Sequence, residues 1–137
     1  MLVTVETVKE HDLQAEQRSP IPAALRSLTG KHDLNAAFVP GSTDAKPNLL
    51  FKGGGMTTLY LNLPPGKGMP VHDHVGCQVT IVCMRGEGNV VLMGEPNRLK
   101  EGELLTFSGE LMVEPRNDSQ APCGLLIMLA ETGTPQG

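Results

Sequence analysis

The sequence has few aromatic residues and little positive charge. Its 137 residues include no Trp, one Tyr and three Phe. So few rings argue against a surface that stacks nucleic-acid bases or sugars. Eleven Lys and Arg against fifteen Asp and Glu give a net charge of −4, and the basic residues form no tract. A binder of phosphate backbones would carry such a tract, so we expect no nucleic-acid partner.

Long hydrophobic runs and paired cysteines are lacking as well. The longest apolar stretch, Leu125 to Ala130, is far too short to span a bilayer. The first residues are acidic and alternate in polarity, unlike a secretory signal, so we expect a cytoplasmic protein with no membrane partner. Three cysteines are an odd number for a disulfide framework, which favours free thiols.

Glycine and proline, in contrast, are abundant: sixteen Gly and eleven Pro divide the chain into short segments. Short alternating segments between such turns predict an all-β sandwich or small barrel. We expect one domain over residues 1–137, with an N-terminal arm to about residue 48 and a barrel core over about 49–131. One short helix is expected between Ser19, a good N-cap before Pro20, and Gly30. The predicted strands are Leu2–Val8, Leu34–Val39, Leu49–Phe51, Met56–Leu63, Cys77–Met84, Asn89–Met93, Leu104–Phe107, Leu111–Val113 and Gly124–Ala130.

The chemically richest segment carries two histidines two residues apart. His72 and His74 follow the turn Pro64-Pro65-Gly66. On an extended backbone, residues i and i+2 project from the same face, where two imidazoles can share a metal ion. Alone, this pattern is a weak signal, because exposed or packing histidines produce it more often.

The spacing around the pair resembles a known signature. Gly66-x5-His72-x-His74-x4-Val79-x6-Gly86 is similar to the first motif of the cupin superfamily, except that valine replaces its glutamate. Downstream, Gly102-x5-Ser108-x-Glu110-x2-Val113-x3-Asn117 resembles the second motif at its first glycine and last asparagine only. The resemblance implies a cupin-type jelly-roll β-barrel. It also implies a homodimer, for which the Leu2–Val8 edge is suited.

In metal-binding cupins, the two histidines and the glutamate of the first motif, with the histidine of the second, hold the ion. The resemblance therefore carries over only His72 and His74 as ligands of a divalent transition metal (Zn, Ni, Fe, Mn or Cu). The other two positions are Val79 and Val113, which cannot ligate. Two imidazoles alone form a poor site.

Which face of the strand after the histidines points inward decides what else joins them. With Val79 inward, the inner set also holds Cys77, Ile81 and Cys83; with Gln78 inward, it is more polar. The apolar set and the Gly86 spacing favour Val79. Cys77 then lies near the pair as a possible extra ligand, and Gln78 is the alternative in the other register.

Two classes of function follow. In the first, an enzyme holds a metal through His72 and His74 and acts on a small molecule, with the reaction type open. In the second, a metal-free barrel binds a small ligand without catalysis, as a sensor does. Thioethers and small apolar side chains are expected to surround the ligand, and those we expect in the pocket are Cys77, Val79, Ile81, Val113 and Met69. Packing alone would also explain these residues.

Overall fold

The computed structural model describes residues 20–133, and the chain divides at Lys31/His32 into two units that are described separately. The described part of the first unit holds one helical turn, α2 (Ala23–Arg26). It is shorter than the helix expected between Ser19 and Gly30. Pro22, the N-cap residue, has an extended backbone (φ −53°, ψ 145°), so the helical turn begins only at Ala23.

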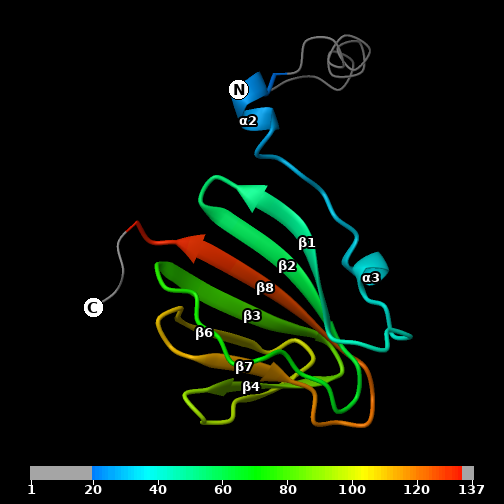
Figure 1. Ribbon diagram of the computed structural model, residues 1–137. Helices are drawn as coiled ribbons and strands as arrows, with labels where there is room; N and C mark the ends of the chain where they lie inside the picture. Colours follow the sequence, from blue (N-terminus) through cyan, green and yellow to red (C-terminus); the bar gives the residue numbers. More distant parts are fainter. Residues whose placement is uncertain (1–19, 134–137) are drawn as a thin grey trace. The chain divides into compact units, whose positions relative to one another are not determined.

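The second unit is built from two antiparallel sheets. Five strands form one sheet in the order β1-β2-β8-β3-β6, and three form the other in the order β5-β4-β7. In Figure 1, β1, β2, β8 and β3 lie side by side in that order. The strands are β1 (Lys46–Gly53), β2 (Met56–Leu63), β3 (Cys77–Arg85), β4 (Glu87–Leu92), β5 (Arg98–Lys100), β6 (Leu104–Ser108), β7 (Val113–Arg116) and β8 (Cys123–Glu131).

The core lies between the two sheets, and the burial of alternate residues shows which face of β3 points into it. Val79 and Ile81 are 1% exposed and Cys83 is fully buried. Residues on the other face are partly exposed, and the amide of Gln78 donates to the Thr106 hydroxyl at 3.2 Å. Because a shift of one residue would turn every side chain to the opposite face, this alternation confirms that Val79 points inward.

Several strand predictions differ from the structure. The prediction of a strand over Leu34–Val39 is wrong, because Asp33 caps a helical turn there, α3 (Leu34–Ala37): its carboxylate accepts from the backbone N–H groups of Asn35 and Ala36. The strand expected at Leu111–Val113 begins only at Val113. Leu111 lies in a turn, where its N–H donates to the Ser108 carbonyl. β5 has three residues, too few for a periodic signal, and was not predicted. The expected strand Leu2–Val8 lies outside the described residues.

We call one end of the barrel, the end at which α3 packs on the outer face of the larger sheet, the closed end. It comprises the last residues of β2 and β3, the first of β8, and the loop 117–121. The Asn62 side chain donates to the Ala37 carbonyl at 3.0 Å and accepts from the Val39 N–H at 2.8 Å. The guanidinium of Arg85 stacks over the Phe38 ring, 4.9 Å from its centre. These contacts hold α3 against the outer face of the larger sheet.

A buried asparagine ties the loop of the closed end to the barrel. Asn117 is fully buried, and its amide donates to the carbonyls of Leu63 and Ala121, each at 2.8 Å. Its oxygen accepts from the N–H and the hydroxyl of Ser119 at 2.9 and 2.7 Å. Within the described residues, no helix is long and apolar enough to cross a membrane.

Candidate functional site

The histidines lie on an arm, Gly66–Gly76, that joins β2 to β3 and runs antiparallel to β7. His72 and Val113 exchange both backbone hydrogen bonds, at 3.0 and 2.7 Å. Residues paired in this way project from the same face, so the His72 side chain stands beside that of Val113, which is 2% exposed. The first and second motifs are therefore neighbours in space, as the resemblance to cupins implies.

His74 is held by the turn between β6 and β7. Its N–H donates to the Gly109 carbonyl at 2.7 Å, and its carbonyl accepts from the Cys77 N–H at 3.0 Å. A Cβ atom at position 109 would overlap the His74 carbonyl oxygen, so only glycine permits this approach. We did not single out Gly109 from the sequence; its place in the spacer of the second motif was the available signal.

The two imidazoles meet edge to face. Their ring centres are 4.8 Å apart and their planes cross at 87°. Nδ1 of His72 is 2.7 Å from the Pro70 carbonyl oxygen. Since that oxygen can only accept, Nδ1 carries the proton in the neutral ring, and Nε2 keeps its lone pair.

Both rings are half-buried at the surface, at the barrel end opposite α3. Burial lowers the pKa of His74, the charge of His72 lowers it further, and Asp73 opposes both effects. The His74 imidazole is therefore mostly neutral at pH 7. We call this region the histidine end; it comprises residues 69–77, the turn 93–95, the turn 108–113 and the end of β8.

The donors present do not fit a complete metal shell. Among the described residues, no group of three or more His, Cys, Asp or Glu side chains could hold a metal ion. Val79 and Val113 occupy the remaining motif positions, and Cys77 does not complete a set of three with the histidines. Gln78 lies on the outer face, bonded to Thr106. A structural or catalytic zinc site needs at least three protein ligands.

The residues expected to line a ligand pocket form a packed floor. Val79, Ile81 and Val113 belong to the buried core cluster, and Met69 packs against it from the arm. Cys77 is partly exposed at the start of β3. The structure thus brings the two histidines and Val113 together at the surface of the core and buries the other apolar members beneath.

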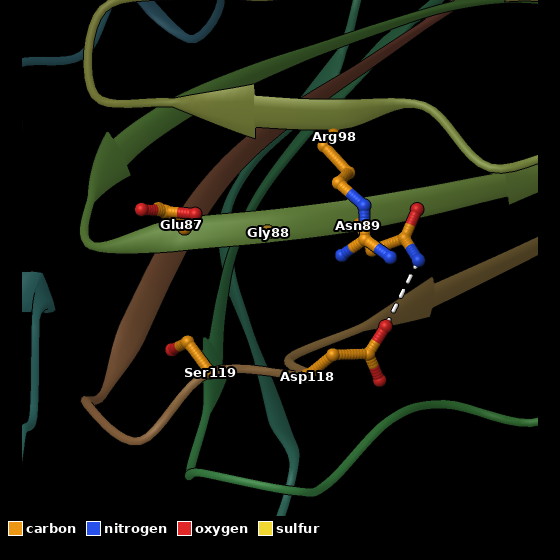
Figure 2. Close-up of a pocket in the computed structure, with 6 residues that line it drawn as sticks. All are labelled: Glu87, Gly88, Asn89, Arg98, Asp118 and Ser119. Atoms are coloured by element: carbon orange, nitrogen blue, oxygen red, sulfur yellow. Dashed lines mark hydrogen bonds between the residues drawn. The ribbon is translucent and has the colours of Figure 1, made fainter.

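Two surface hollows are lined by residues other than the histidines. One, of about 330 Å³, is lined by residues 66–70 of the arm together with Glu114, Arg116 and Asp118. The other, of about 100 Å³, is shown in Figure 2 and is lined by Glu87, Gly88, Asn89, Arg98, Asp118 and Ser119. Asp118 borders both hollows.

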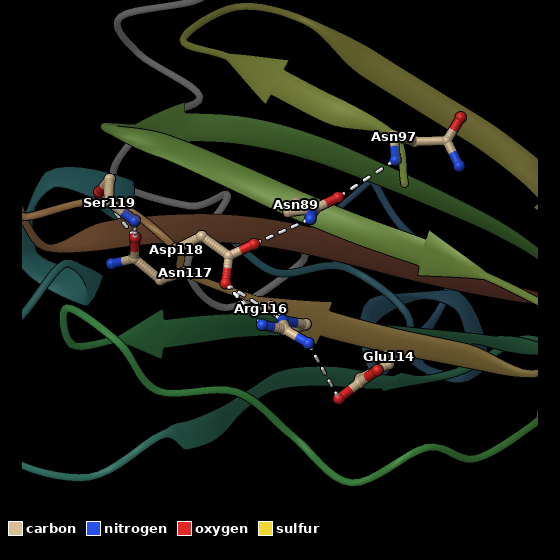
Figure 3. Close-up of polar contacts among 7 residues, drawn as sticks. All are labelled: Asn89, Asn97, Glu114, Arg116, Asn117, Asp118 and Ser119. Atoms are coloured by element: carbon tan, nitrogen blue, oxygen red, sulfur yellow. Dashed lines mark hydrogen bonds and ion pairs between the residues drawn. The ribbon is translucent and has the colours of Figure 1, made fainter. Parts of the chain in front are cut away.

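Asp118 is hydrogen-bonded to polar side chains that lie next to one another across the smaller sheet. Asn89 on β4 is paired with Arg98 on β5 and with Arg116 on β7. The Asp118 carboxylate accepts from Asn89 Nδ2 and from Arg116 Nη2, both at 2.9 Å (Figure 3). These bonds, with Asn89 contributing most, hold the pKa of Asp118 below its usual range. Asp118 thus satisfies the donors of Asn89 and Arg116, and these hydrogen bonds hold the loop 117–121 against the smaller sheet.

Comparison with known proteins shows which folds this chain resembles. A family model described as "Cupin domain" matches residues 59–129. A protein from Thermus thermophilus is 23% identical, covering 75% of this chain and 98% of that chain, with a TM-score of 0.69. A Klebsiella pneumoniae protein with a double-stranded β-helix domain is 15% identical, covering 77% and 93%, with a TM-score of 0.68.

A third solved structure is the cupin domain of an XRE family transcriptional regulator from Enterobacter cloacae. It is 20% identical, covers 64% of this chain and 97% of that chain, and has a TM-score of 0.59. No functionally curated protein matches the sequence. Identities this low establish the fold alone. The family match spans more than half of the chain and includes both motifs, and the two-sheet architecture agrees with it, so the chain belongs to the cupin family.

Proposed function

We propose that this cupin binds a small organic molecule at the histidine end without a resident metal ion. The observation that carries the proposal is the setting of the histidine pair. His72 and His74 lie edge to face at the surface of the core, and Val113 stands directly beside His72 where a third ligand would be needed. Two imidazoles over an apolar floor offer hydrogen bonds together with a hydrophobic contact surface, a combination that suits a ligand of mixed polarity.

A second candidate function, a weakly held divalent metal, is favoured by one specific contact. The Pro70 carbonyl fixes the tautomer of His72 and leaves Nε2 as a lone-pair donor. Metal-ligating histidines commonly have their second nitrogen tied to a carbonyl in this way. An enzymatic role would rest on this candidate, with the metal supplying Lewis-acid chemistry when bound.

Zinc titration of three variants separates the two candidates. The tag-free protein is treated with EDTA and titrated calorimetrically. Because Val113 faces the same side as His72, Val113→His adds a third imidazole, and we expect it to bind zinc at least about tenfold more tightly than the native chain. Met112→His is the matched control: it adds an imidazole at the neighbouring position, which projects to the other side, and should leave zinc affinity unchanged.

The native chain decides the outcome. If it binds one zinc ion as tightly as Val113→His does, and His72→Ala abolishes that binding, the metal-free proposal is wrong and the second candidate replaces it. The predicted homodimer, and the N-terminal strand expected to contribute to it, remain predictions that gel filtration with light scattering tests directly.

A further inference from the structure

Residues 33–39, which we call the strap, lie against the outer face of the larger sheet at the closed end. The strap contains α3 with its N-cap and the two residues that follow it. Asn62 binds its backbone at two points, the Ala37 carbonyl and the Val39 N–H. Only Ala37 is buried, and Val39 is 51% exposed. The strap is thus attached to the barrel by side chains rather than by a strand ladder.

Arg85, at the end of β3, makes two further contacts with the strap. Its Nη2 donates to the Asn35 side-chain oxygen at 3.1 Å, and its guanidinium lies over the Phe38 ring. Such contacts are individually weak near the protein surface. The chain on either side of the strap, residues 28–32 and 40–41, is exposed. Segments with few buried apolar contacts open locally at a lower free energy than the whole fold.

A buried hydroxyl group lies beneath the strap. Tyr60 is fully buried, yet it faces outward from β2, because its neighbour Leu61 belongs to the core cluster. A Cβ atom at position 124 would overlap the Tyr60 hydroxyl and crowd the Phe38 ring, so the phenol tip and that ring meet over Gly124. The hydroxyl has no hydrogen-bond partner among the described atoms. Burial raises the pKa of Tyr60, and the nearby charge of Arg85 opposes that rise.

The unpartnered hydroxyl makes the closed position of the strap costly. A hydroxyl that is taken out of water without a new hydrogen bond raises the free energy of that state, and the cost disappears once water reaches it. Lifting the strap would bring water to the Tyr60 hydroxyl. This gain offsets part of the loss of the contacts that Asn62 and Arg85 make, so the open and closed positions are closer in free energy than those contacts alone would indicate.

We propose that the strap is a lid that opens as one unit while the barrel stays folded, and that it covers Tyr60, Asn62 and Arg85 when closed. The inference goes beyond the proposed function and does not depend on a ligand at the histidine end. In the open position, a phenol, a carboxamide and a guanidinium group are exposed on the outer face of the larger sheet. All three can donate hydrogen bonds, so opening replaces an exposed backbone segment by a surface rich in donors.

Amide hydrogen exchange in the uniformly ¹⁵N-labelled full chain tests whether the strap opens alone. The N–H groups of Ala37 and Val39, which donate to the Asp33 carbonyl and to the Asn62 side chain, report on the strap. We expect both to show one common protection factor, at least about a hundredfold below that of the ladder between β2 and β8. Protection equal to that of the ladder would mean that strap and barrel open together, and the proposal would be wrong.

A matched pair of variants tests the cost of the hydroxyl. Tyr60→Phe removes the unpartnered oxygen and keeps the ring, so the closed strap loses its penalty and the protection of the Val39 amide should rise about fivefold. Thr58→Val removes a hydroxyl from the same face of β2, two residues away and outside the strap, and should leave that protection unchanged. Unchanged or reduced protection in Tyr60→Phe would contradict the proposal.

Tyrosine fluorescence reports on the covered site directly, because Tyr60 is the only Tyr and the chain has no Trp. Phe38→Ala removes the ring that meets the phenol over Gly124, and it should raise the acrylamide quenching constant about threefold while the amides of the ladder between β2 and β8 stay protected. Quenching at the native value would show that the strap does not cover Tyr60. Loss of ladder protection would show that the strap is part of the barrel fold, and either result overturns the proposal.

Discussion

The two ends of the barrel differ in the kinds of contact that their side chains make. At the closed end, polar side chains are buried and bonded: Asn117 makes four hydrogen bonds without any exposure, and Asn62 holds α3 in place. At the histidine end, the imidazole rings are half-buried and apolar side chains are exposed. Each end also holds one buried oxygen with no hydrogen-bond partner among the described atoms, the hydroxyl of Tyr60 at the closed end and Oε2 of Glu110 at the histidine end. Buried polar groups with all their bonds made stabilise a fold, whereas exposed apolar groups and missing bonds cost stability.

This difference indicates which end of the barrel is more available to bind a ligand. Residues that lower the stability of a protein persist at sites that bind something. The closed end, with its bonded asparagines, therefore stabilises the fold, and the more exposed histidine end is where we propose that a ligand binds. Substitutions at the two ends should accordingly affect different measurements.

The largest effect on stability is expected at Asn117. Asn117→Ala removes four hydrogen bonds and takes the amide donor away from the Leu63 carbonyl, while the Ala121 carbonyl keeps only the Ser119 hydroxyl, so the free energy of unfolding should fall by about 3 kcal/mol. Urea denaturation measures this change. His72→Ala, at the other end, serves as the comparison and should cost less than about 1 kcal/mol. Equal losses at both positions would remove the distinction between the ends.

Thiol reactivity should distinguish the same two ends. Cys83 and Cys123 are fully buried towards the closed end, and burial raises the pKa of Cys123 to about 12. Cys77, at the histidine end, is partly exposed. Because the thiolate is the reactive form, iodoacetamide should label Cys77 alone in the native protein and all three thiols in guanidinium chloride, as read by mass spectrometry. Rapid native labelling of Cys123 would show that the closed end opens readily.

The smallest effect is expected at Asp118, which fastens the loop of the closed end from outside. Hydrogen bonds from Asn89 and then Arg116 lower its pKa below the usual 3.8. A carboxylate with a lowered pKa contributes stability that is present above the pKa of the unfolded chain and is lost as the pH falls through the folded value. Because Asp118 is exposed and solvent screens its charge, Asp118→Asn should cost only about 0.5 kcal/mol at pH 7, and much less at pH 3. A pH-independent cost, measured by urea denaturation at both values, would contradict this account.

The sequence predicted the strands well where their period was clear. The range of β2 matches the prediction, because its residues alternate cleanly between a Gly-rich turn and a Pro-Pro-Gly turn. α3 was missed because its helical turn depends on the Asp33 cap rather than on hydrophobic period. β5 was missed because three residues show no period.

The site was predictable only in part, for a related reason. The spacing of the two motifs identified His72, His74, Val79 and Val113, because motif positions can be counted along the sequence without knowing the fold. That Val113 faces His72 follows from backbone pairing between distant segments, which the resemblance implies but alternation alone does not. The role of Gly109 depends on how two turns approach one another, and such a close approach leaves no periodic pattern in a sequence.

The position of β8 has a consequence for how the chain acquires its structure. This strand lies between β2 and β3, and its residues 123–130 pair with residues 56–63. The central ladder therefore cannot close until β8 has left the ribosome, and β2 and β3 must wait with unpaired edges. Folds dominated by such distant pairings form slowly, on the scale of milliseconds to seconds, and are exposed to aggregation in that interval. During synthesis, the residues of β1 to β7 are therefore all translated before the barrel can close.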